Sequence, residues 1–301
     1  MIALVCPGQG SQKPGFLTPW LELNGVANQL AALSQAADID LVYYGTEADE
    51  ETIKDTAIAQ PLIVAAGILV GRQLMQEPGF NIKDLIFAGH SVGEITAAAL
   101  SGVLSDEDAM RFIKVRATGM AQAAAAEKTG MSAVLGGVED EVRTAIEAAG
   151  LTAANSNGGG QIVAAGTLEN LAAFAENPPT KTRVIPLKVA GAFHTTYMES
   201  ALAPLAEFAQ TLTPAEPSST LLSNFDGQPV THGQAALDSL VAQVTRPVRW
   251  DLCMESLKEA KVSKVVELAP AGTLVGLAKR AMRGTPSQAV NTPEDLAEIF
   301  A

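Results

Sequence analysis

The stretch from Asp84 to Gly102 limits the possible folds of this chain most strongly, because it predicts a strand, a tight turn and a helix in direct succession. A short apolar run is followed by the pentapeptide GHSVG of residues 89–93 and then by small residues with a helical pattern. In such a G-x-S-x-G turn the serine backbone is strained, and glycines flank it because larger side chains would clash there. This succession predicts an α/β fold with the serine oxygen projecting at the top of the sheet.

The same turn suits a nucleophile. Ser91 lies at its centre, and the next backbone N–H, that of Val92, points to the start of the helix, where anionic oxygens are stabilised. An ordinary loop is the alternative, since G-x-S-x-G also occurs by chance. The strand before the turn and the helix after it favour the functional interpretation.

A second glycine-rich loop, PGQGSQK at residues 7–13, follows an N-terminal strand. It lacks the G-x-x-x-x-G-K-[ST] sequence of a Walker loop and the third glycine of a dinucleotide fingerprint. What remains is a glycine loop at the carboxyl end of a strand, where open α/β sheets build their sites. We expect that its exposed N–H groups can hold an anion.

Composition argues against several kinds of partner. The net charge of −13 disfavours nucleic acid and anionic membrane surfaces, and an acidic partner would need a local cationic patch. The two cysteines, Cys6 and Cys253, form no cluster with the three histidines. We therefore expect reduced core cysteines and no metal site.

No targeting or membrane segment is expected. The apolar run from Ile2 to Cys6 has the length of a strand and lacks the charged start and long apolar region of a signal peptide. No run approaches the ~18 apolar residues of a membrane span. A soluble cytoplasmic protein is the expectation.

Residues 127–190 differ in pattern from the rest of the chain and predict a small subdomain. The expected order is β-α-β-β-α-β, that of a split βαβ, ferredoxin-like unit. Its expected elements are strands at 131–136, 151–155, 161–165 and 183–189, helices at 138–149 and 168–176, and a turn at 156–160. The unit is expected to be inserted into a larger core formed by residues 1–126 and 191–301.

Helical and strand patterns also fill the expected core. Thr56 to Leu74 predicts a buried helix, and Asp106 to Ala126 predicts a helix with its N-cap at Ser105. The remaining expected elements are helices from after residue 194 to about 212, at 237–244, opening at 246–250 and at 273–283, with strands at 221–224 and 264–268.

A serine nucleophile needs a base, and the chain contains three histidines. His90 adjoins Ser91 and is expected to face away from it across the turn. His232 lies in a polar loop and is expected to be solvated. His194 stands at a junction between a strand pattern and a helix pattern, where a structural and a catalytic role both stay open.

Arg116 lies among Ile113, Val115 and Met120 in the predicted 106–126 helix. A buried guanidinium needs an anion, and its planar fork matches a carboxylate bidentately. A surface arginine or a structural salt bridge is the alternative.

Seven segments, spread over nearly the whole chain, match the motifs of one known family and occur in the same order as in that family. The chain resembles the malonyl-CoA:acyl-carrier-protein transacylases of fatty-acid synthesis, the family that also supplies acyltransferase domains to polyketide synthases, and it looks closest to actinobacterial members. The segments are PGQGSQ (7–12), GHSVGE (89–94), the helix of Arg116, GAFH (191–194), SNFDG (223–227), QVTRPVRW (243–250) and LAPAGTL (268–274).

The resemblance implies a role for each matching residue. Ser91 is the nucleophile and His194 is the base. The backbone N–H groups of Gln9 and Val92 form the oxyanion hole. The backbone carbonyl of Gln243 orients the histidine in place of a triad aspartate. The implied fold is an α/β-hydrolase-like core with a parallel sheet and an inserted ferredoxin-like subdomain.

The resemblance also implies how substrate is bound. Arg116 binds the free carboxylate of malonyl, and the bulky Phe193 is associated with exclusion of α-branched malonyl units. Gly191 replaces the histidine of many malonyl-specific members, which leaves the breadth of substrates open. The substrate-binding set is completed by Met120, Asn155 and Asn224.

The implied function is transfer of malonyl from malonyl-CoA, through an ester on Ser91, to the phosphopantetheine thiol of acyl carrier protein. The resemblance implies catalysis by a serine–histidine dyad, with no cofactor beyond the two substrates. The enzyme is expected to be a monomer. A serine hydrolase such as a thioesterase is one alternative, but a long-chain hydrolase has no use for Arg116. A non-catalytic interaction subunit is another, and the intact Ser91 and His194 argue against it.

Acyl carrier proteins are acidic, as the resemblance implies, so a cationic surface is expected near the mouth of the site. The final predicted helix carries Lys279, Arg280 and Arg283 at its carboxyl end, and Arg183 of the small subdomain is expected to complete the patch. The alternative is that these cations only complement the helix dipole.

Overall fold

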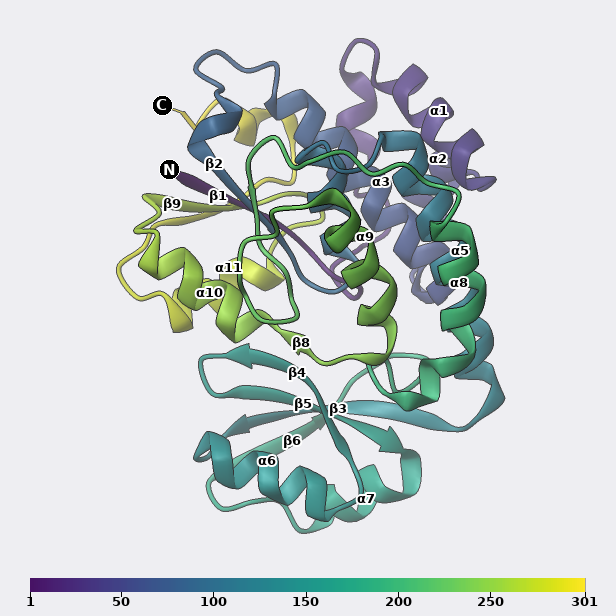
Figure 1. Cartoon of the computed structure of the whole chain (residues 1–301), viewed down its shortest axis with the longest axis vertical. Coiled ribbons are helices and arrows are strands. Elements are labelled where there is room, and N and C mark those ends of the chain that lie inside the picture. Colours follow the sequence, from purple (N-terminus) through teal and green to yellow (C-terminus); the bar gives the residue numbers. More distant parts are fainter. Residues whose placement is uncertain (301) are drawn as a thin grey trace.

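The strand of the GHSVG segment lies inside a parallel sheet. The computed structural model describes residues 1–300 and contains two five-stranded sheets, one above the other in Figure 1. The first has the order β10-β9-β1-β2-β7, and every neighbouring pair in it is parallel. Its strands are β1 (Ile2–Cys6), β2 (Leu85–Gly89), β7 (Thr220–Leu221), β9 (Lys264–Glu267) and β10 (Ser287–Ala289).

β1 and β2 are buried on both faces because helices cover both sides of this sheet. Side chains alternate between the faces along a strand, so Leu4 and Phe87 pack into one hydrophobic cluster while Ala3 and Ile86 pack into another. This two-sided burial explains why both strands are continuous apolar runs in the sequence. The predicted α/β fold with a parallel sheet is confirmed.

The helices around the first sheet fall into two groups. On one side lie α1 (Val26–Ala37), α2 (Leu41–Thr46), α3 (Thr56–Leu74), α4 (Gly93–Leu100), α5 (Asp106–Ala126), α8 (Leu202–Ala209) and α9 (Gly233–Ala242). On the other side lie α10 (Trp250–Glu259) and α11 (Thr273–Ala281).

α3 corrects the expectation that no apolar run has the length of a membrane span. It has 19 residues and a mean hydropathy of 1.5, which by length and composition alone would suffice to cross a membrane. However, 78% of its apolar window is buried inside the protein, so α3 is the buried core helix that the sequence predicts. Gly67 and Gly71 let it pack closely on α4, since a Cβ there would overlap Thr96 or Leu100.

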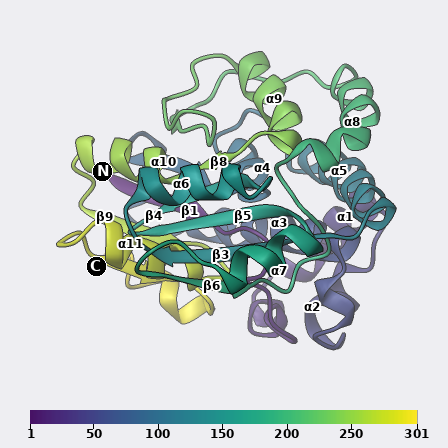
Figure 2. The same cartoon turned by 90° about the horizontal axis from the view of Figure 1, so that it is seen from below.

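The second sheet, with the order β6-β3-β5-β4-β8, is antiparallel except for its last pair. Two helices cover the face turned away from the first sheet (Figure 2), where they enclose a small separate core. The strands are β3 (Thr129–Gly136), β4 (Thr152–Gly158), β5 (Gln161–Thr167), β6 (Thr182–Pro186) and β8 (Val248–Arg249), and the helices are α6 (Glu139–Ala148) and α7 (Leu168–Glu176). Residues 129–186 therefore follow the predicted β-α-β-β-α-β order.

β8 was not predicted, and it comes from outside the 127–190 segment. The sequence suggested that residues 246–250 open a helix, but α10 begins only at Trp250. Before it, Val248 and Arg249 pair in parallel with Asn155 and Ser156 of β4. The second sheet thus includes a strand from the later part of the chain, a pairing that no local pattern indicates.

Several boundaries in the second sheet differ from the predictions, since β3 begins two residues earlier and β5 ends two residues later than predicted. The turn predicted at 156–160 is shorter, because β4 continues to Gly158 through two register shifts against β5. The strand predicted at 183–189 ends at Pro186. Residues 187–189, which follow it, line the pocket described below.

Several boundaries in the core also differ, and the helix predicted at 237–244 is α9, which begins at Gly233 and ends at Ala242. The strand predicted at 221–224 ends at Leu221. Beyond Leu222 the chain leaves β2, since the backbone N–H of Ser223 donates to the carbonyl of Gln228 and that of Asn224 donates to the side chain of Glu94. The helix predicted after His194 is a 3₁₀ turn at Thr196–Ala201 followed by α8. α11 ends at Ala281, so Arg283 lies beyond the helix.

Candidate active site

The turn between β2 and α4 has the geometry that its glycines predict. Ser91 has a φ of 54°, in the left-handed region that non-glycine residues rarely adopt. A Cβ on Gly89 would overlap the backbone of Gly93, and a Cβ on Gly93 would overlap the carbonyl of Cys6. Both glycines are therefore required by close backbone approach, and the serine is held at the carboxyl edge of the parallel sheet.

Ser91 and His194 come together although 103 residues separate them in the chain. Ser91 Oγ lies 2.7 Å from His194 Nε2, and His194 Nδ1 lies 2.9 Å from the backbone carbonyl oxygen of Gln243. A carbonyl can only accept, so Nδ1 carries the proton and Nε2 is left to accept from the serine hydroxyl. Burial, together with the charge of Arg116, lowers the pKa of His194 to about 3. The ring is neutral near pH 7 and can take a proton.

Neither of the other two histidines is hydrogen-bonded to Ser91 Oγ. His90 lines the same pocket as Ser91 rather than facing away from it, and there its Nε2 lies 2.9 Å from Asn157 Oδ1 and its ring packs edge-on against Trp250. The side chain of His232 is 76% exposed, with Nδ1 3.5 Å from Glu216. His194 is the histidine that reaches Ser91.

Two backbone N–H groups close to Ser91 are available to a ligand. Within residues 1–300, neither the N–H of Gln9 nor that of Val92 donates to another protein group. The loop of Gln9 is anchored by its side chain, which donates to Thr56 Oγ1 at 3.3 Å and accepts from Gln60 Nε2 at 3.4 Å. Preorganised donors of this kind stabilise charge that develops on an oxygen.

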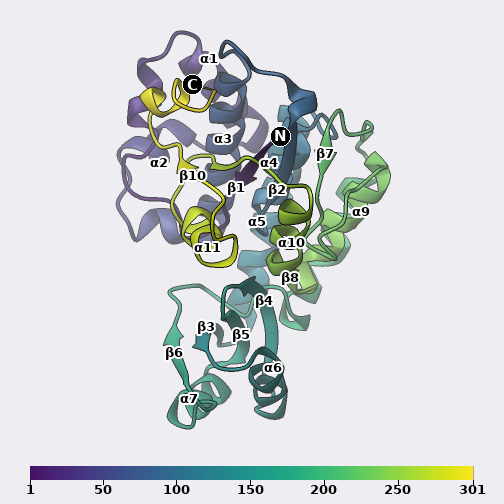
Figure 3. The ribbon, with the colours of Figure 1, turned by 90° about the vertical axis from the view of Figure 1, so that its left-hand side faces the viewer.

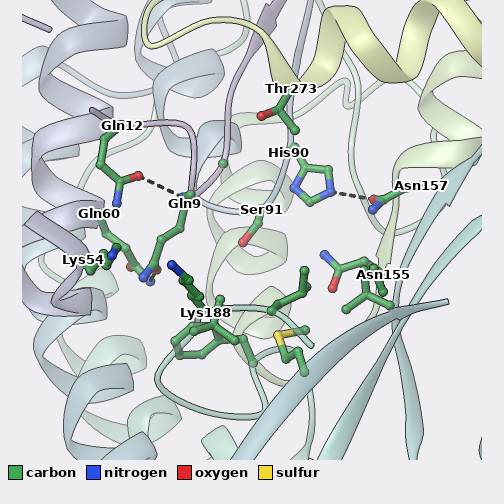
Figure 4. Close-up of a pocket in the computed structure, with 18 of the residues that line it drawn as sticks. Gln9, Gln12, Lys54, Gln60, His90, Ser91, Asn155, Asn157, Lys188 and Thr273 are labelled. Atoms are coloured by element: carbon green, nitrogen blue, oxygen red, sulfur yellow. Dashed lines mark hydrogen bonds between the residues drawn. The ribbon is translucent and has the colours of Figure 1, made fainter. Parts of the chain in front are cut away.

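Ser91 opens into a pocket of about 750 Å³ between the two sheets (Figure 4). This volume is within the usual range for small-molecule sites. Three of the predicted substrate residues line it, namely Phe193, Met120 and Asn155. Asn155 Oδ1 is buried and has no hydrogen-bond partner within residues 1–300, which leaves an acceptor at the pocket wall.

Gly191 packs too closely for a side chain. A Cβ at this position would lie 2.8 Å from the Cβ of Ala124 and 3.3 Å from Thr129 Oγ1. A larger residue here would therefore need the end of α5 to move.

Arg116 is buried as predicted, but the structure does not place it on the pocket wall. Its Nη1 donates to Gln60 Oε1 and its Nη2 donates to Gln243 Oε1, each at 2.7 Å, while Nε has no partner within residues 1–300. Burial lowers the pKa of Arg116 to about 10, and the charge of Glu94 opposes this shift. The guanidinium remains a cation, and two of its nitrogens are occupied by the amide oxygens of Gln60 and Gln243. Gln60, and not Arg116, is among the residues that line the pocket.

Asn224 also differs from its predicted role, because it lies beneath the turn rather than among the residues that line the pocket. Its Oδ1 accepts from the backbone N–H of Ser91 at 2.7 Å, and its Nδ2 donates to the carbonyl of Gly89 at 2.6 Å. With both halves of its amide occupied in this way, Asn224 supports the nucleophile rather than the ligand.

Several polar residues of the site were not predicted from the sequence. Glu94 lies under the turn, and its only signal was its place at the end of the GHSVGE segment. Gln60 gave no signal. Three lysines, Lys13, Lys54 and Lys188, also line the pocket. Lys13 ends the glycine loop noted in the sequence, whereas Lys54 and Lys188 lie far from it in the chain and belong to no motif.

The predicted docking cations are exposed. Figure 3 shows α11 at the side of the first sheet that faces the second, and its residues Thr273 and Leu277 line the pocket. Gly159, at the tip of the β4–β5 hairpin, lies against the side chain of Arg280. The strand register places Arg183 in one row with Leu135, Gln161 and Gly158, at the same end of the second sheet as this hairpin tip.

Cys6 and Cys253 are buried free thiols, as predicted. Among the described residues, no three His, Cys, Asp or Glu side chains gather closely enough to hold a metal ion.

Comparison with known proteins adds to this geometry. The acyl transferase domain family matches residues 3–294. The malonyl CoA-acyl carrier protein transacylase of Mycobacterium tuberculosis is 54% identical over 299 residues, covering 99% of both chains. A crystal structure of MCAT from the same organism has a TM-score of 0.97 and 54% identity, covering 100% of both chains.

A further solved structure is a complex with a partner. It contains a type II PKS acyl-carrier protein bound to its malonyl-transacylase, with a TM-score of 0.91 and 29% identity, covering 98% of this chain and 97% of that chain.

Proposed function

The chain belongs to the acyl transferase domain family, and we propose that it transfers malonyl from malonyl-CoA to the phosphopantetheine thiol of acyl carrier protein, supplying extender units for fatty-acid synthesis. The observation that carries the proposal is the 2.7 Å contact between Ser91 Oγ and a neutral His194, placed in a pocket of substrate size. The identity of 54% to a mycobacterial malonyl CoA-acyl carrier protein transacylase over 99% of both chains supports the same substrates.

In the first half-reaction, Ser91 Oγ attacks the thioester carbonyl while His194 Nε2 takes the hydroxyl proton. The N–H groups of Gln9 and Val92 donate to the oxyanion of the tetrahedral intermediate, and loss of one such donor typically costs ~3 kcal/mol. The carbon–sulfur bond then breaks, and His194 gives its proton to the leaving thiolate of coenzyme A. Malonyl remains as an ester on Ser91.

The second half-reaction reverses these steps with a different thiol. His194 takes the proton of the phosphopantetheine thiol, whose sulfur attacks the ester carbonyl, and then returns the proton to Ser91 Oγ as the ester bond breaks. The carbonyl of Gln243 fixes the histidine tautomer without adding a negative charge, so the imidazolium is less stabilised than in a full triad. A thioester has a good leaving group, so we propose a dyad with no metal and no cofactor.

Selection of malonyl is assigned to Arg116, with Phe193 and Met120 shaping the acyl pocket. A carboxylate that replaced the amide oxygen of Gln60 would complete a charge-assisted fork on the guanidinium. An acetyl group would gain nothing from that cation. The unpartnered Oδ1 of Asn155 offers an acceptor for an amide N–H of a pantetheine arm.

The surroundings of the pocket fit two acidic substrates. Lys13, Lys54 and Lys188 at its wall attract anions. We assign docking of the carrier protein to Lys279, Arg280, Arg283 and Arg183. We also propose that the enzyme works as a monomer in the cytoplasm.

The finer description of the fold is part of this proposal. We infer an α/β-hydrolase-like core formed by residues 1–126 and 191–301 and a ferredoxin-like subdomain formed by residues 127–190. The strand–turn–helix around Ser91 supports the first. The β-α-β-β-α-β succession and the strand order β6-β3-β5-β4 support the second.

The hydrolase alternative is not favoured, because the relatives of high identity and full coverage are transacylases. Intact-protein mass spectrometry after mixing with malonyl-CoA alone tests the proposal. A stable adduct of one malonyl group is expected. Release of free malonate with no accumulation of adduct would favour a hydrolase instead.

A further inference from the structure

Glu94, the second residue of α4, is a buried carboxylate that the mechanism above does not use. It is 6% exposed and lies beneath the turn that carries Ser91. Its Oε1 accepts the backbone N–H of Asn224 at 2.5 Å, and its Oε2 accepts from the side-chain amide of Gln243. A buried carboxylate with both oxygens occupied by N–H donors requires those donors to be correctly oriented.

The two partners of Glu94 are the residues that hold the dyad. Asn224 accepts the backbone N–H of Ser91 through Oδ1 at 2.7 Å. Gln243 Nε2 donates to the carbonyl of Ser91 at 3.0 Å, and the Gln243 carbonyl accepts from His194 at 2.9 Å. Asn224 and Gln243, which Glu94 holds, are thus hydrogen-bonded directly to the backbone N–H and carbonyl of Ser91 and to the ring of His194.

Glu94 also determines which way the amide of Gln243 points. Arg116 carries only donors, and it faces Oε1 of Gln243 at 2.7 Å. Ionised Glu94 carries only acceptors, and it faces Nε2. A flipped amide would set a donor against Arg116 and an acceptor against the carboxylate, so this pair of opposite charges permits a single orientation.

We propose that Glu94, in its ionised form, is a positioning residue that holds Gln243 and Asn224 so that Ser91 and His194 are aligned for acyl transfer. The proposal rests on the proposed function, since its effect is measured on acylation of Ser91. Protonated Glu94 carries an O–H donor. It would face either the backbone N–H of Asn224 or the side-chain N–H of Gln243, and neither of these groups can accept a hydrogen bond. The alignment should therefore weaken as Glu94 takes up a proton.

Burial raises the pKa of Glu94 to about 7, even though Asn224, Gln243 and Arg116 favour the charged form. The nearby Asp226, in the loop after β7, raises it further, and burial raises the pKa of the Cys253 thiol on α10. Between pH 8 and pH 5, Arg116 stays charged and Cys253 stays neutral. Glu94 is the group of this cluster that changes its charge there.

The other ionisable groups near the cluster lie in different surroundings. The pKa of His194 is about 3, and burial lowers that of His90. On the remaining elements packed against α4, Arg72 of α3 is paired with Asp106, Asp238 of α9 is exposed, and burial raises the pKa of the β1 thiol, Cys6. An acid limb in the acylation rate below about pH 7 is therefore assigned to Glu94.

The test is the rate of Ser91 acylation by malonyl-CoA, measured by rapid quench and intact mass between pH 5 and pH 8.5. In the wild type we expect the maximal acylation rate to fall as pH drops through about 7. In Glu94→Gln, whose amide can satisfy only one of the two donors, we expect the maximal acylation rate at pH 8 to be about 10- to 100-fold lower. The malonyl-CoA concentration that gives the half-maximal rate should change little, and the rate should no longer depend on pH over this range.

Two further variants give the contrast. Glu94→Asp keeps the charge, so it should recover part of the rate and retain the acid limb. Glu267→Gln is the matched control, because Glu267 is also a buried carboxylate that accepts backbone N–H groups, at the start of α11. It should lower the melting temperature and leave the pH profile of acylation unchanged in shape.

A Glu94→Gln enzyme with the wild-type rate, or with an undiminished acid limb, overturns the proposal. If that variant does not fold, the wild-type profile decides, because a flat rate between pH 8 and pH 6 also overturns it. Absence of any malonyl adduct on the wild type would instead overturn the proposed function, so the two failures are distinguishable.

Discussion

The active site has a buried floor, formed by the side chains beneath Ser91, and an exposed rim, formed by lysines at the pocket wall. Both are polar, but the floor is shielded from water and the rim is not. Beneath Ser91, the side chains of Asn224, Gln243 and Glu94 are buried and each is hydrogen-bonded to another member of the group. At the rim, Lys54 pairs with Glu50 and Glu51 in partly exposed contacts, and Lys188 is exposed.

This difference separates two tasks. Buried hydrogen bonds act at low dielectric and fix geometry, so changes in the floor should alter chemistry and selectivity. Exposed charges are screened by water and salt and contribute little to fixed structure, so changes at the rim should alter encounter with charged substrates. The following predictions test this division, from the largest expected effect to the smallest.

Ser91→Ala should abolish formation of the malonyl-enzyme, because no other nucleophile occupies the turn. Intact mass after incubation with malonyl-CoA measures this directly. The variant should keep the wild-type melting temperature within a few degrees, which separates lost chemistry from lost fold. Full labelling of the variant would contradict the assignment of the nucleophile.

His194→Ala should lower transfer by about 10²- to 10⁴-fold, the usual contribution of a general base. The single-turnover rate of acylation is the measurement. A loss of less than tenfold would assign His194 a structural role and break the proposed dyad.

Arg116→Ala tests selectivity within the floor. It should depress malonyl transfer while acetyl transfer stays the same or improves, since the guanidinium helps only the substrate with a carboxylate. Arg116→Lys should also be impaired, because a point charge cannot reproduce a bidentate fork.

The matched control is Arg111→Ala, on the exposed side of the same helix, where Arg111 pairs with Glu107 and Asp108. It should leave the ratio of malonyl to acetyl transfer unchanged. Equal losses for both acyl groups in Arg116→Ala would mean that Arg116 only holds Gln60 and Gln243 in place.

Charge reversal on α11, outside the pocket wall, should have the smallest effect. The double variant Lys279→Glu/Arg280→Glu should raise KM for the carrier protein several-fold and leave Ser91 malonylation by malonyl-CoA unchanged. Added salt should slow the wild-type carrier reaction more than the coenzyme A half-reaction.

Lys258→Glu/Lys261→Glu is the control for this experiment. It changes net charge by the same amount and also removes a cation from the last turn of a helix, α10. Unlike α11, which contributes Thr273, Leu274 and Leu277 to the pocket wall, α10 contributes no residue to it. If both double variants behave alike, the cations of α11 complement the helix dipole and docking lies elsewhere.

The features predictable from sequence were those determined by neighbours in the chain. In the turn around Ser91, Gly89 is required by the close approach of the Gly93 backbone, four residues later in the chain. α5 begins after Ser105, whose side chain accepts the backbone N–H of Asp108, and it ends at Ala126 as predicted. Local backbone preference and apolar period determine such elements wherever they lie in the fold.

The site depended on more than local pattern. The sequence by itself indicated Ser91 and the three histidines, and the resemblance singled out His194 and the carbonyl of Gln243. The partners of Arg116, the place of Asn224 beneath the turn and the pairing of β8 with β4 were decided only by the tertiary structure. Each of these is a contact between segments far apart in the chain, and the donors and acceptors of Gln60, Glu94 and Gln243 can be matched only once folding has brought them together.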